Sequence, residues 1–198
     1  MVLCVLSACL SCSSHVTSNS QEPDSPVAQG TYEKLQWLRD FGSEYEYNTD
    51  YMEALLEMSP EAYASFEAAM EMGESRKYLS LEAHHVAKIS ALMGDNCGAC
   101  TQLGLRLAVE AGVSREILHH LMSEPELLPD LLRLIYEHAN EVIQGNNANL
   151  KRVAQLREAL GDKGFAELSI NIIGVGIYPA LRRSVGAETV CPAPSLDF

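Results

Sequence analysis

The sequence predicts an all-α domain of about eight helices, and three observations support this fold class. Apolar residues recur at intervals of three and four through most of residues 31–185, which is the spacing of amphipathic helices. Gly, Pro, Asn and Asp separate these segments, as expected at helix ends. The Ile-rich stretch 168–181, which could also form a buried strand, lacks the period-two alternation of a half-buried strand. We therefore expect one all-α domain over residues 31–198.

The first half of this domain contains four predicted helices, at residues 31–41, 51–58, 60–70 and 81–93. In the first of them, Leu35 and Leu38 belong to a row of apolar residues at helical spacing. Ser59 followed by Pro60 is typical of a helix start, with Ser as the N-cap and Pro at the first helical position. Ser80 is the expected N-cap of the fourth helix.

The second half contains predicted helices at residues 97–111, 114–122, 127–143, 149–160 and 163–185. Gly112 ends the first of these, because glycine readily adopts the left-handed conformation of a helix end. The last segment leads into Arg182 and Arg183, which are typical of a helix C-terminus. Within this segment, the stretch 168–181 is interrupted by Asn171, Gly174, Gly176 and Pro179 and is too short for a transmembrane span.

The chain carries a formal net charge of −13, from 14 Lys and Arg against 27 Asp and Glu. Such a chain lacks the basic patch that nucleic acid or an anionic membrane surface would require, so we expect neither as a partner. Residues 31–75 contain eleven acids against two bases. These acids alternate with apolar residues, which is typical of the solvated faces of amphipathic helices. We therefore expect no catalytic or binding role for them.

Residues 1–30 form a predicted leader and linker, in which a short apolar run passes into a stretch rich in Ser, Pro and Asn. Leu6-Ser7-Ala8-Cys9 is similar to a bacterial lipobox, which would make Cys9 a lipid anchor and the protein an exported lipoprotein. No Lys or Arg precedes the apolar run, in contrast to a typical signal sequence. A low-complexity cytoplasmic N-terminus is the alternative.

Two of the six cysteines have a spacing that indicates chemistry, Cys97 and Cys100. Asp95 and Asn96 are suitable N-caps, so Cys97 is expected in the first turn of a helix, where free N–H groups and the helix dipole favour a thiolate. Cys100 would lie one turn further on the same face. This arrangement is typical of a redox-active dithiol. Half of a zinc site, or two small core residues, are the alternatives.

The preceding helix contributes a candidate base, His85. It lies four residues after Leu81 and four before Ile89, so we expect it to point inward with them. An imidazole one short loop away from a dithiol is suited to be its general base or charge partner. A core histidine that hydrogen-bonds a backbone carbonyl is the alternative. His84 is expected on the solvated face, and Glu82 is a weaker candidate.

The stretch 79–112 resembles the carboxymuconolactone decarboxylase and alkylhydroperoxidase D family. The resemblance rests on an ionisable residue, His85, twelve positions before a C-x-x-C that opens the next helix; residues 45–51 and 177–183 resemble the flanks of larger members more loosely. It implies a small helical fold, a homo-oligomer, and a dithiol of Cys97 and Cys100 that reduces peroxides or a partner's disulfide. In the hydroperoxidase branch, a Glu and a His relay protons to the attacking second cysteine.

Both relay positions differ in this chain. The relay Glu falls on His85, and the relay His, four residues after the second cysteine, falls on Gly104. Gly104 would leave a gap beside Cys100 that admits either substrate or a close-packed helix. Helix-terminus physics favours Cys97 as the more acidic thiol, whereas the resemblance makes Cys100 the attacking one, and the order stays open.

The leading functional hypothesis is a thiol-dependent antioxidant oxidoreductase without a cofactor. Its Cys97–Cys100 disulfide would be reduced by an external dithiol, and His85 would be the base. The alternative is a non-catalytic helical domain that binds a ligand or partner outside the cytoplasm. A zinc site of the two cysteines with His84 or His85 would need a fourth ligand, and a lactone decarboxylase follows from the family name alone.

The remaining candidates are weaker. His119, His120 and His138 are expected at the surface or between helices. Four tyrosines are candidates for a pocket or for the core: Tyr45, Tyr47, Tyr51 and Tyr78. No role is expected of Cys191.

Overall fold

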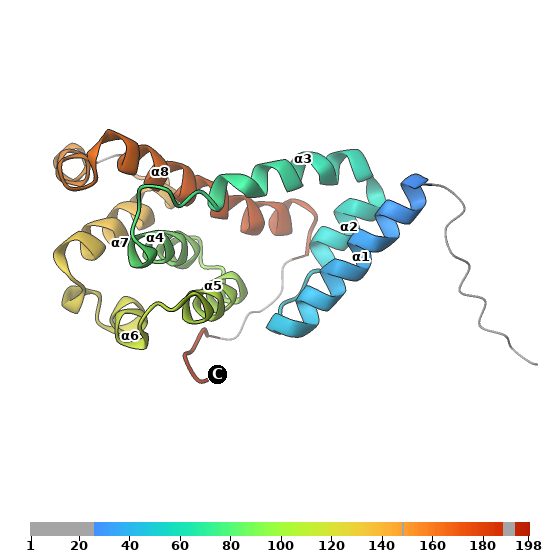
Figure 1. Ribbon diagram of the computed structural model, residues 1–198, viewed down its shortest axis with the longest axis horizontal. Helices are drawn as coiled ribbons and strands as arrows, with labels where there is room; N and C mark the ends of the chain where they lie inside the picture. Colours follow the sequence, from blue (N-terminus) through green and yellow to red (C-terminus); the bar gives the residue numbers. More distant parts are fainter. Residues whose placement is uncertain (1–25, 148, 188–192) are drawn as a thin grey trace, which may run out of the picture.

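The computed structural model describes residues 26–147, 149–187 and 193–198, and within them it contains helices and no strands (Figure 1). The all-α prediction is therefore confirmed. The elements are α1 (Pro26–Tyr45), α2 (Asp50–Met58), α3 (Pro60–Met70), the 3-10 turn η1 (Glu71–Gly73), α4 (Leu81–Gly94), α5 (Gly98–Ala111), α6 (Arg115–Ser123), the 3-10 turn η2 (Pro125–Leu127), α7 (Asp130–Ile143) and α8 (Leu150–Ser184).

Helix ends form where the capping residues predict them. The side chains of Ser59, Ser80 and Ser114 each accept a hydrogen bond from the backbone N–H three residues further on, and so cap α3, α4 and α6. Gly112 ends α5 with a left-handed φ of 98°. Local sequence chemistry thus sets the boundaries of the helices on both sides of the C-x-x-C motif.

Three helices differ most from the expected bounds. Helix α7 begins at Asp130 and not at 127, since residues 125–127 form the 3-10 turn η2. Helix α1 begins at Pro26, inside the predicted linker, and continues to Tyr45; proline is well suited to a first helical turn. In α8, Gly161 has a non-helical φ of 68°, so the two predicted segments follow each other end to end. The predicted leader up to residue 25, with its lipid anchor at Cys9, and the tail residue Cys191 lie outside the described residues.

Helix α4 lies at the centre of the larger of two hydrophobic clusters. It packs mainly against α7 and also against α8 and α5 (Figure 1). Small residues permit this close packing: Ala83, Ala87 and Ala91 are fully buried, and a Cβ on Gly94 would lie 3.0 Å from the side chain of Asn140 on α7. The C-x-x-C motif follows directly from this best-packed helix.

Helices α1, α2 and α3 form a second cluster, which packs against α5 and the end of α8. Its buried members include Leu38, Tyr51 and Leu56, and Ala99 of α5 is packed against it. Among the described residues, α8 is the one helix whose length and composition would permit a membrane span. In this structure α8 packs against α4, α7 and η1 instead.

A buried carboxylate, Glu167 of α8, holds the loop before α4 in place. It accepts hydrogen bonds from the backbone N–H groups of Lys77, Tyr78 and Leu79 and from the hydroxyl of Ser75, at 2.6 to 2.9 Å. Burial opposes ionisation, but these hydrogen bonds outweigh it and lower the pKa of Glu167 to about 2. Glu167 thereby fixes the loop that leads to the N-cap of α4.

Candidate functional site

Cys97 and Cys100 form a disulfide at the start of α5, with their Cα atoms 5.3 Å apart. Cys97 is the N-cap of α5, and Gly98 is the first helical residue. The expectation that Cys97 lies within the first turn is therefore wrong by one position, because Asn96 takes a left-handed φ of 53° in the tight turn from α4 instead of capping α5. The backbone N–H of Cys97 bonds to the carbonyl of Leu92, which ties the motif to the end of α4.

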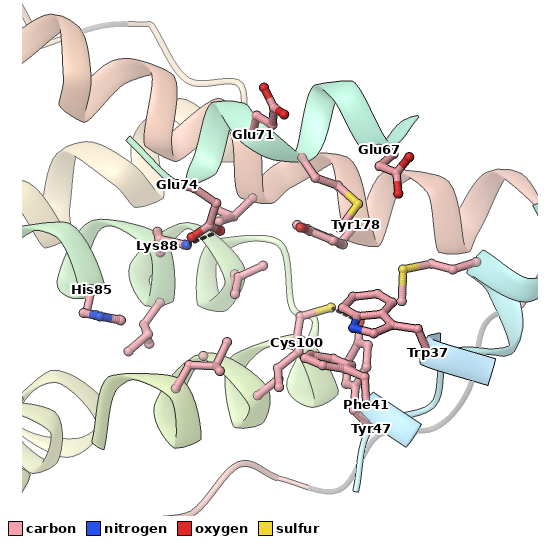
Figure 2. A pocket seen from close by; sticks show the side chains of 18 residues that line it. Trp37, Phe41, Tyr47, Glu67, Glu71, Glu74, His85, Lys88, Cys100 and Tyr178 are labelled. Carbon is pink, nitrogen blue, oxygen red and sulfur yellow. Dashed lines mark hydrogen bonds and ion pairs between the residues drawn. The ribbon is translucent and has the colours of Figure 1, made fainter. Parts of the chain in front are cut away.

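A pocket of about 470 Å³ lies beside this disulfide, between the two hydrophobic clusters (Figure 2). Its volume is in the range of small-molecule sites. Cys100 lines the pocket and Cys97 does not. Most of the other lining residues are apolar or aromatic, and they include Trp37, Phe41, Met52, Met70, Ile89, Leu92, Leu103, Leu107, Val175 and Tyr178.

Tyr47 is the polar side chain in contact with the sulfur of Cys100. Its hydroxyl lies 3.8 Å from Sγ and 2.9 Å from the hydroxyl of Tyr51, which is fully buried. Phe41 packs edge-on against Tyr47, and Trp37 stacks on Phe41. Because Trp37 is about half exposed, the aromatic side chains lead from the surface to the sulfur.

The guanidinium of Arg182 lies over both tyrosine rings, 5.3 Å from the centroid of Tyr47 and 4.8 Å from that of Tyr51. Arg182 is buried, and it also donates to the carbonyl of Asn48. Burial raises the pKa of Tyr51 well above its usual value, with Tyr47 adding to the effect and Arg182 opposing it. Tyr51 is therefore a protonated hydrogen-bond donor throughout the physiological pH range.

The two histidines of α4 agree with the expectation only in part, because His84 does not lie on a solvated face. His84 is buried, whereas His85 is only partly buried and lines the pocket. Burial, together with the nearby Lys88, lowers the pKa of His85 to about 4. Figure 2 shows His85 at one end of the pocket, well apart from Cys100, which lies beside Trp37 and Tyr47. His85 precedes Leu92, whose carbonyl accepts from the N–H of Cys97, by two helical turns, or about 10 Å.

Helix packing accounts for the glycine at position 104. A Cβ there would lie 3.2 Å from Ile89 and 3.5 Å from Leu92, both on α4. The sequence left two roles open for the gap beside Cys100, room for a substrate or a close-packed helix. At the Cβ position, the gap is occupied by side chains of the packed helix α4. Gly104 also lines the pocket, so its missing side chain keeps the pocket open as well.

Three acids of the 31–75 segment line the pocket, Glu67, Glu71 and Glu74. All three are exposed. Glu74 forms an ion pair with Lys88 at 2.8 Å, and Glu67 pairs with Lys34. The sequence pattern indicated only solvated helix faces, because it does not reveal that α3 and η1 border a cavity.

The other candidates lie elsewhere. His119 is exposed, and His138 is buried against Phe165 on α8, as expected of packing residues. Tyr45 hydrogen-bonds Glu110, and Tyr78 is half exposed. Tyr47 is thus the candidate tyrosine that the fold brings to Cys100, and Tyr51 is hydrogen-bonded behind it. The sequence named both as pocket candidates without a pattern that linked them to the cysteines.

In the part of the chain that the structure describes, no three His, Cys, Asp or Glu side chains are grouped as metal ligands. The zinc hypothesis therefore gains no third ligand near the two cysteines. Comparison of the chain with family models, curated proteins and solved structures finds no match.

Proposed function

We propose that this protein is a thiol-dependent peroxidase of the alkylhydroperoxidase type, in which Cys97 and Cys100 cycle between dithiol and disulfide. The observation that carries the proposal is the placement of Cys100, which joins a disulfide partner at a helix start and also lines an apolar pocket. The resemblance of residues 79–112 to that family supports the same activity.

Burial of the sulfurs favours a small peroxide over a protein disulfide as the substrate. Cys97 is 8% exposed and Cys100 is 3% exposed. Thiol–disulfide exchange requires the attacking sulfur to reach its target directly, and a folded partner has no such access here. A small hydroperoxide can enter the pocket, and the external dithiol must likewise be slender enough to reach the disulfide.

The proposed reaction begins with the thiolate of Cys100, which attacks the terminal oxygen of the hydroperoxide. The O–O bond breaks, Cys100 becomes a sulfenic acid and the alkoxide leaves. The thiol of Cys97 then attacks the sulfur of Cys100, which releases water and forms the disulfide. Two thiols and one hydroperoxide thus give one disulfide, one alcohol and one water. An external dithiol returns two electrons and two protons.

The pocket supports Cys100 as the attacking thiol, which is one of the two orders that the sequence left open. Cys97 does not line the pocket, yet its sulfur is within bonding distance of Cys100. This geometry suits a resolving cysteine. Cys97 is also the N-cap of α5, where the positive end of the helix dipole favours a thiolate.

Tyr47 is positioned to take the part of the missing proton relay. Its hydroxyl can donate to the thiolate of Cys100 and then protonate the leaving alkoxide, since it lies 3.8 Å from the sulfur. Tyr51 donates to or accepts from Tyr47 at 2.9 Å, and the charge of Arg182 over both rings stabilises a transient phenolate. The proton that the Cys100 thiol loses on ionisation passes to solvent, and the phenolate takes a proton back from solvent.

The direct test is dithiol-dependent consumption of cumene hydroperoxide by the wild type, Cys97→Ser and Cys100→Ser, with zinc analysis of the same samples. We expect turnover by the wild type and at most background rates for both variants. Equal, background-level rates in all three would refute the peroxidase. One equivalent of bound zinc would support a metal site instead.

A second candidate is a non-catalytic ligand-binding domain, and the size and apolar lining of the pocket favour it. The sole tryptophan of the chain, Trp37, lines this pocket, so its fluorescence reports occupancy whether or not chemistry follows. Ligand binding without loss of hydroperoxide would favour this second candidate.

A further inference from the structure

The charged groups around the pocket are confined to one side of it. Glu67, Glu71 and Glu74 come from α3, η1 and the residue after it, and Lys88 comes from α4. The Cys100 end is enclosed by Trp37, Phe41, Tyr47 and other aromatic or apolar side chains (Figure 2). A ligand whose reactive group reaches the sulfur therefore lies in an apolar channel and passes an acidic border.

The one cation in the lining, Lys88, is already neutralised. Its ammonium lies 2.8 Å from a carboxylate oxygen of Glu74, as the dashed line in Figure 2 marks. The Lys88 side chain is 15% exposed, which limits its access to a second anion. Without Glu74, the same ammonium would be a suitable partner for the carboxylate of a bound fatty acid.

The remaining charges are negative. Among the described residues no ion pair is recorded for Glu71, and Glu67 is paired with Lys34, which does not line this pocket. His85 adds no positive charge near neutral pH, because its pKa is lowered to about 4 by burial. The three lining acids therefore set the sign of the charge at the border of the pocket.

We propose that Glu74 and Glu71 make the pocket selective for uncharged apolar ligands and exclude those with a carboxylate. The inference rests on the proposed function in one respect: the physiological ligand is then an uncharged alkyl or aryl hydroperoxide. Glu74 is a specificity determinant because it occupies the ammonium of Lys88. Glu71 adds repulsion at the border. Neither residue is required for the reaction at Cys100.

The test uses Trp37 fluorescence to measure the affinities of 1-decanol and decanoate for the full-length protein at pH 7.5 and 0.15 M salt. We expect decanol to bind at least about tenfold more tightly than decanoate. In each of the single variants Glu74→Gln and Glu71→Gln, the ratio of the affinities for decanol and decanoate should fall by about threefold or more. Glu57→Gln is the matched control, because Glu57 is an exposed acid of the same segment that does not line the pocket; its preference should be unchanged.

Equal affinities for decanol and decanoate in the wild type would overturn the proposal. The proposal would also fail if the affinity ratio changed equally in Glu74→Gln and Glu57→Gln, or if neither compound bound to the wild type. A separate measurement of hydroperoxide consumption distinguishes failure of the selectivity proposal from failure of the proposed peroxidase function. Selective decanol binding without turnover would leave the selectivity intact and refute the peroxidase.

Discussion

At the scale of single residues, the contact between the Tyr47 hydroxyl and Cys100 connects the pocket to the chemistry. A neutral phenol near a thiolate stabilises the charge by hydrogen bonding and can also supply a proton to the leaving alkoxide. The two residues lie 53 positions apart in the sequence, at 3.8 Å between hydroxyl oxygen and sulfur. This pair therefore depends on how the α1–α3 cluster packs on α5.

We predict that Tyr47→Phe lowers kcat/KM for cumene hydroperoxide by about tenfold or more, since general acid catalysis by one side chain contributes about 100-fold or more. The pKa of the Cys100 thiol should rise, because its thiolate loses a hydrogen bond. Tyr178→Phe is the matched control, as Tyr178 lines the same pocket. Equal losses of activity in Tyr47→Phe and Tyr178→Phe, with the same pKa of the Cys100 thiol in both, would contradict a role of Tyr47 in proton transfer.

For His85→Ala we expect less than about a threefold loss of kcat at saturating peroxide. The reasons are its separation from Cys100 in the pocket and its lowered pKa of about 4, which makes it a weak base at neutral pH. The pH–rate profile between pH 6 and 8 should keep its shape in this variant. A shift in the Cys100 thiol pKa would instead restore His85 as its charge partner.

At the scale of helices and loops, Glu167 connects α8 to the segment before α4. Replacing it by Gln leaves backbone N–H groups without a charged acceptor, so Glu167→Gln should destabilise the fold by about 2 kcal/mol at pH 7. Chemical denaturation measures this loss, with the exposed Glu158→Gln of the same helix as control. A loss equal to that of the control would contradict the anchoring role.

The lowered pKa of Glu167 also predicts a pH dependence. The pKa of Glu167 is lowered from 4.5 to about 2 in the folded state. Its carboxylate therefore stabilises the folded state fully at pH values above 4.5, the pKa expected in the unfolded chain. That contribution declines as the pH falls from about 4.5 towards 2. Wild type should therefore lose more stability over this interval than Glu167→Gln, and parallel losses would refute the assignment.

The close crossing of α8 and η1 supplies another test of the packing around the pocket. A Cβ on Gly174 would lie 2.4 Å from the backbone nitrogen of Gly73, which cannot move aside cheaply. Gly174→Ala should cost about 2 kcal/mol or more, measured by thermal or chemical unfolding. In Gly176→Ala the nearest atom is the tip of Ile143 at 3.3 Å, so little or no loss is expected. Similar stability of both variants would contradict this packing.

Local sequence signals predicted most of the helices but not the details of the site. Serine caps and the glycine at position 112 act through adjacent backbone groups, so they could be read directly. The burial of His84 was missed for a different reason: α4 is packed by neighbours on several sides, so its apolar stripe alone did not define the buried face. Tyr47 and Glu74 reach the site through tertiary contacts that no local pattern encodes.

At the scale of the whole molecule, the pocket lies where two hydrophobic clusters meet. One cluster centres on α4 and supplies Ile89 and Leu92, and the other is built from α1 to α3 and supplies Tyr47. Cys100 belongs to the first and contacts the second. Boundaries between packed units are common places for small-molecule pockets. The homo-oligomer and the lipid anchor stay predictions of the sequence.

The most direct test of the central claim mixes the fully reduced, full-length protein with one equivalent of cumene hydroperoxide in the absence of other reductants. We predict one hydroperoxide consumed for each Cys97–Cys100 disulfide formed, mapped by peptide mass spectrometry. In Cys97→Ser a sulfenic acid should accumulate on Cys100, and the double variant Cys97→Ser/Cys100→Ser controls for the remaining cysteines. Peroxide loss no faster than in the double variant, or a sulfenic acid on Cys97 in Cys100→Ser with none on Cys100, would contradict the account.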